Sequence, residues 1–217
     1  MNLEQARFNM VEQQIRPWEV LDQAVLDLLY AVPREEFVPP AFRRLAFADM
    51  EIPIGEGEAM MAPKIEARLL QALALRKTER VLEVGTGSGY LTALLARCAA
   101  HVYSLEIRPA LAAFGRENLA RHGADNLTLE VGDGARGEAK RAPYDAIVLT
   151  GSTPVLPGVL KEQLAPGGRL FAVVGELPVM VATLVTCTAP GAYASVGLFD
   201  TVLAPLVNAA QPPRFRF

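Results

Sequence analysis

The sequence predicts an α/β fold: a doubly wound, mainly parallel sheet that follows an N-terminal helical extension and finishes in an antiparallel C-terminal hairpin. Three observations lead to this prediction. From residue 80 onward, short Val/Leu/Ile-rich runs alternate with helical patterns, as in a parallel sheet with helices on both faces. Three glycines, Gly85, Gly87 and Gly89, follow the first run and open an Ala/Leu-rich segment, which indicates a strand, a tight turn and a helix N-terminus. Two final strand-like segments meet at Ala189-Pro190-Gly191, where a hairpin turn is expected.

Residues 1–75 are predicted to form a helical extension, because they contain no strand–helix–strand unit of their own. The first helix has apolar side chains at helical spacing: Phe8, Val11 and Ile15. Pro17 ends that helix. Asp22 is expected to be the N-cap of the next helix, whose apolar positions are Val25, Leu26, Leu28 and Leu29. Trp18, between the two helices, is expected to be a packing anchor.

A loop rich in Gly and Pro, residues 47–57, lies between the first two helices and the core. It precedes a predicted helix from Pro63 to about residue 75, with Pro63 in the first turn. A loop at this place is expected to form one lip of a cleft, on the substrate side. The chain is therefore divided into residues 1–75, the helical extension and lip, and residues 76–217, a cofactor-binding core that is one compact unit.

Within the core, strands are expected at 80–84, 101–105, 127–131, 145–150 and about 169–174, followed by the hairpin strands 179–188 and 193–202. Helices are expected at about 89–98, after Pro109 and after Pro157. The segment Pro166-Gly167-Gly168 is expected to be a turn before the strand at 169.

Composition narrows the class of protein. The chain has 217 residues, 51% of them hydrophobic and 21% charged, with a formal net charge of −3, as expected for a globular protein with a full core. Neither an apolar run of membrane-spanning length nor a signal sequence is recognisable, and no nucleic-acid partner or membrane association is expected. Two cysteines and two histidines (Cys98, Cys187, His101, His122) predict neither a disulfide framework nor a metal site. A cytoplasmic location fits best.

Acidic residues follow the second and third predicted strands. Glu106 stands about 20 residues beyond the glycine loop, the spacing of an acid that binds ribose hydroxyls. Asp133, between two glycines at the next strand end, can accept a hydrogen bond from an adenine amino group. The carboxyl ends of neighbouring parallel strands share one edge, where ligands bind. Either acid alone would more often be a solvated charge, but together with the glycine loop they indicate a nucleotide-like cofactor.

Tyr90 stands where a dinucleotide-binding loop requires a third small residue, which argues against NAD. The order of Glu83 and the three glycines resembles instead motif I of class I S-adenosylmethionine (SAM) methyltransferases, in which free helical N–H groups suit the carboxylate of SAM. Glu83 is predicted to face the cleft and attract the ammonium or sulfonium side of SAM; capping of local N–H groups is the alternative. The predicted cofactor-binding residues are Glu83, Gly85, Thr86, Gly87, Ser88, Gly89, Glu106, Ile107, Asp133 and Gly134.

Nearly the whole chain resembles the protein-L-isoaspartate O-methyltransferase family. The segments that match are Val32-Pro33-Arg34-Glu35-Glu36-Phe37-Val38, Ile52-Pro53-Ile54-Gly55-Glu56-Gly57, residues 81–90, Tyr103-Ser104-Leu105-Glu106, Gly132-Asp133-Gly134, residues 142–148, Gln163-Leu164 with Gly167-Gly168, and Ala204-Pro205-Leu206. The resemblance implies a seven-stranded, Rossmann-like class I methyltransferase core. It also implies SAM as cofactor, S-adenosylhomocysteine as its product, and methylation of an isoaspartyl carboxylate in protein repair.

The lip departs from the family pattern. The family has Gln-Thr-Ile-Ser, with the Ser at the active site, where this chain has Glu58-Ala59-Met60-Met61. Thr150-Gly151-Ser152 and Ala204-Pro205-Leu206 replace the family's Thr-Ala-Ala and Val-Pro-Leu. Thioethers cannot donate hydrogen bonds to a carboxylate, and Glu58 would repel one. The substrate lip is predicted to include Ile54, Met60 and Met61, and repair activity is expected to be weak or absent.

No catalytic residue is assigned, because the family Ser is Met61 here and a carboxylate nucleophile needs no general base. A different nucleophile would need one, and Glu58, Asp49 and Glu51 are the candidates in the lip. Three functions therefore stay open. These are an isoaspartyl methyltransferase acting on peptides, the same fold acting on a partly apolar small molecule, and a non-catalytic SAM-binding protein.

Overall fold

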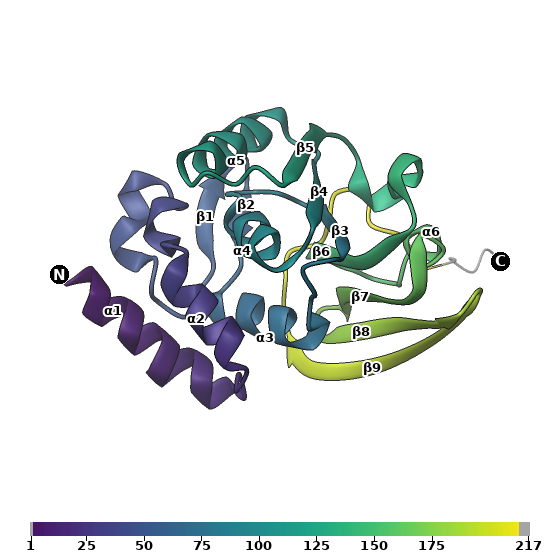
Figure 1. The fold of residues 1–217 in the computed structure, drawn as a ribbon, viewed down its shortest axis with the longest axis horizontal. Coiled ribbons are helices and arrows are strands. Elements are labelled where there is room, and N and C mark those ends of the chain that lie inside the picture. The colour runs from purple at the N-terminus through teal and green to yellow at the C-terminus, as the bar shows by residue number, and fades with distance from the viewer. Residues whose placement is uncertain (1, 213–217) are drawn as a thin grey trace.

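A seven-stranded sheet runs through the centre of the computed structural model, which describes residues 2–212 (Figure 1). The strands lie in the order β5-β4-β3-β6-β7-β8-β9. Their bounds are Arg80–Val84 (β3), His101–Glu106 (β4), Leu127–Val131 (β5), Tyr144–Thr153 (β6), Leu164–Glu176 (β7), Val179–Ala189 (β8) and Ala192–Thr201 (β9). The prediction of a mainly parallel sheet with an antiparallel C-terminal hairpin is confirmed.

Strands β5, β4, β3, β6 and β7 are parallel, and β8 and β9 continue the sheet antiparallel. The central strand β3 pairs with β4 from Arg80 opposite His101 to Val84 opposite Leu105. Because the neighbouring strands β3, β4 and β5 are parallel, their carboxyl ends share one edge of the sheet. The sheet thus places the glycine loop, Glu106 and Asp133 beside one another.

Helices cover both faces of the sheet (Figure 1). Their bounds are Leu3–Asn9 (α1), Gln23–Ala31 (α2), Pro63–Leu73 (α3), Tyr90–Cys98 (α4), Pro109–Arg121 (α5) and Gly158–Lys161 (α6). One hydrophobic cluster joins side chains of α2, α3 and α4 to one face of β3, while a second, smaller cluster includes the other face of β3 and Leu160 of α6. The extension therefore shares a continuous core with the sheet.

The first helix follows the prediction in part. Val11 and Ile15 are buried, but Phe8 is 48% exposed and Met10 is buried in its place. Residues Met10–Ile15 form a π-helix, whose wider turn shifts the buried face relative to an α-helix. Asp22 caps α2 as predicted, since its carboxylate accepts a hydrogen bond of 2.9 Å from the Ala24 N–H.

The lip contains strands that the sequence did not predict. Strands β1 (Ile52–Gly55) and β2 (Glu58–Met60) form a short antiparallel hairpin instead of an irregular loop. Its two-residue turn, Glu56-Gly57, has φ angles of 54° and 79°, as a tight hairpin turn requires. Ile52 and Ile54 are buried between exposed neighbours, a period-two pattern that is too short to stand out in the sequence.

The segment predicted as a turn at Pro166-Gly167-Gly168 lies inside β7. There the register against β6 shifts between Tyr144 and Ala146, so the glycines form an irregularity in a strand and do not end it. A Cβ at Gly168 would lie 2.9 Å from the carbonyl oxygen of Tyr144, so this close approach of two backbones needs glycine.

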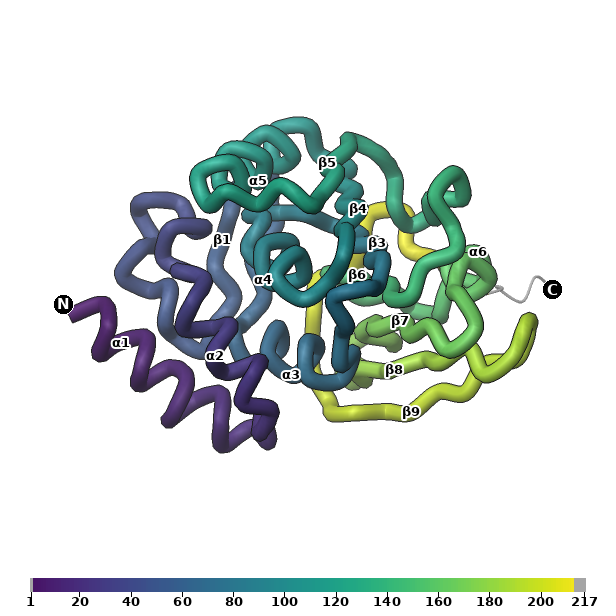
Figure 2. Tube along the Cα trace, in the orientation of Figure 1, coloured from purple at the N-terminus to yellow at the C-terminus, as the bar shows by residue number. Residues whose placement is uncertain are grey.

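Beyond β9 the chain turns back across the end of the sheet, as the yellow segment in Figure 2 shows. Residues 203–207, named here the strap, lie beside the end of β6, where Pro205 bridges to Ser152. Trp18 packs edge-on against Phe199 of β9 and lies under the Lys64 ammonium, but it is 37% exposed and lies outside the hydrophobic core, so it meets its predicted role as a packing anchor only in part. Among the described residues no helix is both long and apolar enough to cross a membrane.

Candidate functional site

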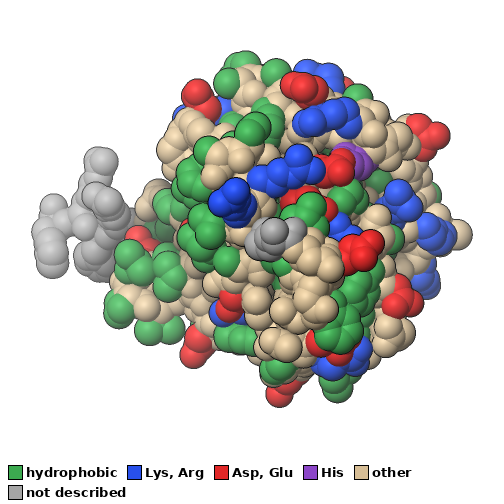
Figure 3. Space-filling view, turned by 90° about the vertical axis from the view of Figure 1, so that its left-hand side faces the viewer, with side chains coloured by type: hydrophobic (Ala, Val, Ile, Leu, Met, Phe, Trp, Pro, Cys, Tyr) green, Lys and Arg blue, Asp and Glu red, His purple; other side chains and the backbone are tan. Residues whose placement is uncertain are grey.

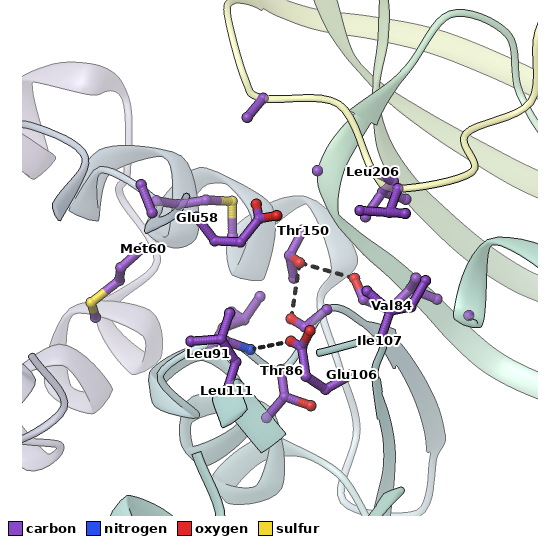
Figure 4. Close-up of a pocket in the computed structure, with 18 of the residues that line it drawn as sticks. Glu58, Met60, Val84, Thr86, Leu91, Glu106, Ile107, Leu111, Thr150 and Leu206 are labelled. Carbon is purple, nitrogen blue, oxygen red and sulfur yellow. Dashed lines mark hydrogen bonds between the residues drawn. The ribbon is translucent and has the colours of Figure 1, made fainter. Parts of the chain in front are cut away.

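A cleft lies at the carboxyl ends of the central strands, and its empty space, counted with the open solvent at its mouth, is about 930 Å³. Its floor comes from the glycine loop, the turns after β4 and β5, and Thr150. The lip forms one wall and the strap forms the other. Figure 4 shows Glu58 on the lip side, Leu206 on the strap side, and Glu106 and Thr150 between them.

The glycine loop has the conformation that its residues suggest. Gly85, Gly87 and Gly89 have φ angles of 99°, 52° and 82°, which L side chains rarely adopt. A Cβ at Gly85 would lie 2.1 Å from Thr150 Oγ1, and that hydroxyl is 2.9 Å from the carbonyl oxygens of both Val84 and Gly85. Helix α4 begins directly after Gly89, which offers no capping side chain. The Tyr90 N–H donates to Ser88 Oγ at 3.3 Å, and the next N–H groups, those of Leu91 and Thr92, are the ones available to an anionic ligand.

Glu106 lies on the floor of the cleft, almost fully buried, next to this loop. Its Oε2 accepts a hydrogen bond of 2.8 Å from the Gly87 N–H, and its Oε1 accepts one of 3.0 Å from the Arg108 N–H. Each carboxylate oxygen can accept a further hydrogen bond. The backbone thus orients Glu106 and leaves it free to accept from a pair of ligand hydroxyls.

Asp133 also lines the cleft, at the end of β5. Its Oδ1 accepts from the Ala135 N–H at 3.2 Å, and its Oδ2 lies 2.9 Å from Arg136 Nε and 3.0 Å from Asn208 Nδ2. A Cβ at the next residue, Gly134, would lie 2.7 Å from Val84 Cγ1, so the turn passes close to β3 only because residue 134 is glycine. The sequence indicated Asp133 and Gly134 but not the two side chains that hold the carboxylate.

Glu83 does not line the cleft, contrary to the expectation that it faces the ligand. Side chains alternate along β3, and Leu82 and Val84 belong to the cluster on the opposite face, so Glu83 points toward α4. Its Oε2 accepts hydrogen bonds from Thr92 Oγ1 (2.5 Å) and Ser104 Oγ (2.6 Å), while its Oε1 is buried with no partner among the described residues. Burial raises the pKa of Glu83 to about 8, so the side chain is largely protonated at neutral pH.

Met60 and Met61, each 5% exposed, belong to the large hydrophobic cluster as well as to the cleft wall. In Figure 4 Met60 points away from Thr150 and Glu106. The Met61 carbonyl accepts a hydrogen bond of 2.5 Å from the fully buried Arg34. Arg34 thereby anchors the end of the lip to the residues beneath it.

Arg34 is a residue that the sequence did not predict for the site. Its guanidinium also donates to the Ala46 carbonyl at 2.9 Å and pairs with Glu66, a buried acid that lines the cleft. Burial raises the pKa of Glu66 to about 7, while the charge of Arg34 and its hydrogen bond lower it in part. Arg34 stands in the matching segment at 32–38, but nothing in that segment predicted a buried guanidinium.

The acids of the lip differ in their partners. Glu58 Oε1 accepts from Arg108 Nε at 2.8 Å and lies 2.6 Å from Arg108 Nη2. Asp49 is paired with Lys64 at 2.8 Å and does not line the cleft, which weakens its candidacy as a general base. Glu51 lines the cleft, and partial burial raises its pKa.

Two departures from the family pattern lie against each other. Ser152 is bonded to the strap by three hydrogen bonds: its N–H donates to the Ala204 carbonyl (2.8 Å), its carbonyl accepts from the Leu206 N–H (2.9 Å), and its Oγ donates to the Leu203 carbonyl (2.7 Å). A Cβ at Gly151 would lie 2.9 Å from Leu206 Cδ2. Gly151 therefore leaves room for Leu206, and the Ser152 hydroxyl adds one side-chain hydrogen bond to the two that the backbone makes with the strap.

The residues of the cleft fit SAM. The glycine loop and the helix start that follows it suit the carboxylate of an amino acid. The buried carboxylate at the end of the next strand suits a ribose. The residues that would hold SAM are 85–89 at its amino-acid end, Glu106 at the ribose, and Asp133 with Gly134 at the adenine. Neither histidine lines this cleft: His101 lies 2.9 Å from Thr128 Oγ1, and His122 stacks on Phe37.

The chain is similar to known proteins along almost its whole length. The family model described as "Protein-L-isoaspartate(D-aspartate) O-methyltransferase (PCMT)" matches residues 5–207. A protein-L-isoaspartate O-methyltransferase of Methanoculleus marisnigri is 48% identical over 169 residues, 78% of this chain and 77% of that protein. One from Hyperthermus butylicus is 38% identical over 215 residues, which is 94% of this chain and 89% of that protein.

Solved structures show the same fold. A Plasmodium falciparum protein described as a protein-L-isoaspartate O-methyltransferase, in complex with S-adenosyl-L-homocysteine, superposes with a TM-score of 0.81 at 23% identity. The similarity covers 95% of this chain and 99% of that one. A second structure with the same enzyme name has a TM-score of 0.78 at 24% identity, over 92% of this chain and 65% of its own.

Proposed function

This chain belongs to the protein-L-isoaspartate(D-aspartate) O-methyltransferase family, and on that premise we propose that it methylates the free carboxylate of an isoaspartyl residue in a peptide or protein. It is a SAM-dependent methyltransferase by family. The observation that carries the proposal is the extent of the match, since residues 5–207 include the cofactor floor, the lip and the strap.

When bound, SAM would supply a methyl group on a sulfonium sulfur: a carboxylate oxygen of the acceptor bonds to the methyl carbon in line as the carbon–sulfur bond breaks, and neutral S-adenosylhomocysteine leaves. The residues of this chain bind and orient. The glycine loop and the start of α4 would hold the cofactor, and Glu106 would orient it through its ribose. The lip and strap form the two walls between which the acceptor enters. A carboxylate is already a nucleophile at neutral pH, so orientation can supply most of the rate.

In our proposal the lip makes methylation of the isoaspartyl carboxylate slower than in family members that have Gln-Thr-Ile-Ser there. The acceptor carboxylate must leave water, and hydrogen-bond donors hold it in place. Met61 offers no donor, and the nearby Glu58 is an acid, although Arg108 neutralises part of its charge. Backbone N–H groups of the lip are then the donors that remain.

The test measures methyl transfer from labelled SAM to two peptides that differ only in an isoaspartyl or an ordinary aspartyl residue. We expect base-labile methyl ester on the isoaspartyl peptide alone. Equal labelling of both peptides, or of neither, would contradict the proposal. A family member with Gln-Thr-Ile-Ser in its lip serves as the positive control.

A second candidate is methylation of a small, partly apolar acceptor. It is favoured by one observation: the walls of the cleft between lip and strap are mostly apolar, with Ile54, Met60, Met61, Leu203 and Leu206. Flexible thioethers adapt to varied ligand shapes. Turnover of small alcohols, phenols or acids with no turnover of isoaspartyl peptides would select this function.

A further inference from the structure

The charged side chains that line the cleft all have the same sign. Among the described residues they are Glu51, Glu58, Glu66, Glu106 and Asp133, with no Lys, Arg or His. On the face of the molecule shown in Figure 3, by contrast, basic and acidic side chains are intermixed. A single sign of charge is therefore a property of the cleft itself.

Most of these acids have a countercharge. Glu58 is paired with Arg108, Glu66 with Arg34, and Asp133 with Arg136. Glu106 accepts two backbone hydrogen bonds and faces the cofactor side. Glu51 is the exception, because it makes no salt bridge or side-chain hydrogen bond with the rest of residues 2–212.

Glu51 stands directly before β1, on the lip wall and away from the cofactor floor. It is exposed, so a bound acceptor could reach it without unfolding the lip. Glu51 lies at the open end of the hairpin, next to the pair Ile52 and Met60, and Glu58 lies at its turn end, opposite Gly55. Both acids line the lip wall.

We propose that Glu51 is a specificity-determining residue that selects acceptor peptides with a cationic side chain near the isoaspartyl residue. This inference rests on the proposed function. The acceptor carries a negative carboxylate into a cleft lined by acids, which opposes binding. A Lys or Arg in the peptide offsets that repulsion when its charge lies near Glu51, the lip acid that lines the cleft without a salt-bridge partner among the described residues. A Glu in the same place adds to it.

The experiment compares isoaspartyl peptides that differ at a single position. Lys, Ala or Glu is placed in turn at each of four positions, the two before and the two after the isoaspartyl residue. We expect kcat/KM to fall in the order Lys, Ala, Glu at one or more positions, by about three- to tenfold from Lys to Glu, the size of an exposed ion pair. The difference should lie mainly in KM, since charge acts on binding. The difference in KM between the peptides should be smaller at high salt than at low salt, because salt screens the charges.

Two variants assign the effect to Glu51. Glu51→Gln should reduce the Lys-to-Glu ratio of kcat/KM to less than twofold. Glu56→Gln is the matched control, because Glu56 is an exposed acid of the same hairpin that does not line the cleft. The ratio should be unchanged in that variant.

The possible results distinguish a failure of this inference from a failure of the proposed isoaspartyl methyltransferase function. If all isoaspartyl peptides react at equal rates, the inference is wrong and the proposed function stands. A fall in kcat for every peptide in Glu51→Gln would also overturn the inference, because it would make Glu51 part of the chemistry. If no isoaspartyl peptide reacts, the proposed function and the inference fall together.

Discussion

The floor of the cleft and its lip are built in different ways. The floor depends on backbone conformation over a few residues: three glycines with positive φ, one helix start and one acid at each of two strand ends. The lip depends on contacts between distant parts of the chain, such as Arg34 with the Met61 carbonyl and Glu58 with Arg108. A site that depends on unusual backbone conformations tolerates few changes of sequence. A lip that depends on side-chain pairs can be rebuilt when both members of a pair are replaced together.

The largest expected effect is in the lip anchor. Arg34→Met should lower the free energy of unfolding by about 3–5 kcal/mol, since it leaves Glu66 buried without its partner. The loss should be larger at pH 8 than at pH 5.5. Without Arg34 the folded-state pKa of Glu66 rises further above its unfolded value, and stability from such a group is lost as pH rises through the folded pKa. Urea unfolding at both pH values measures this.

The double variant Arg34→Met with Glu66→Met is the control for that prediction. It should recover much of the lost stability and remove the added pH dependence, because no buried carboxyl group remains. A double variant as unstable as the single one would show that the hydrogen bonds of Arg34 to Ala46 and Met61, and not its pairing with Glu66, hold the lip.

A smaller effect is expected in the floor. Gly85→Ala should lower the free energy of unfolding by roughly 2–4 kcal/mol and abolish measurable SAM binding, because a Cβ there meets Thr150 and φ is 99°. Gly123→Ala is a matched control, with a φ of 62° and nothing within 4 Å of the added Cβ. It should cost about 1 kcal/mol and leave SAM binding intact. Equal losses in both variants would mean that the fit against Thr150 contributes nothing.

The acids of the floor come next. Glu106→Ala should weaken SAM binding by about 1.5–3 kcal/mol, and Asp133→Ala by about 1–3 kcal/mol, measured by titration calorimetry. Glu130→Ala, which removes an acid of β5 that is paired with Arg141 outside the cleft, should change the affinity little. Unchanged affinity in the first two variants, with the fold intact, would show that the strand ends do not hold SAM.

The smallest effect is expected for the salt bridge across the lip. Arg108→Ala should lower kcat/KM for an isoaspartyl peptide by about 1–1.5 kcal/mol, or some five- to tenfold, because the unpaired Glu58 then repels the acceptor carboxylate. Adding Glu58→Gln to that variant should restore the rate, since the repelling charge is gone. If the double variant stays slow, Arg108 itself contacts the acceptor and the interpretation of Glu58 is wrong.

The same contrast explains how much the sequence could predict. Strand β3 and the glycines after it could be predicted because a short apolar run followed by alternate glycines is typical of a buried strand and a tight turn. Strand β5 is observed at the predicted residues 127–131. The short strands β1 and β2 were missed, since three or four residues show almost no period. Glu83 was expected to face the cleft, but the position of an acid next to the glycine loop does not say to which face of the strand it points.

The sequence pattern could not predict contacts between side chains that lie far apart in the chain. Arg108 lies 50 residues from Glu58, and Arg34 lies 27 residues from Met61. Ser152 and Leu203 of the strap, which are joined by a hydrogen bond, lie 51 residues apart in the sequence. Such contacts become visible only when the sheet and lip are folded, because nothing local marks one partner for the other.

We propose that this chain combines a cofactor floor typical of the family with a rebuilt lip that slows isoaspartyl methylation. The most direct measurement is kcat/KM on one isoaspartyl peptide for the natural chain and for a variant with Gln-Thr-Ile-Ser at residues 58–61. Hydrogen bonds to a charged group contribute about 1.5–3 kcal/mol, so the variant should be roughly ten- to a hundredfold faster with the same affinity for SAM. Equal kcat/KM for the two proteins would contradict the claim, because the lip would then have no influence on the reaction.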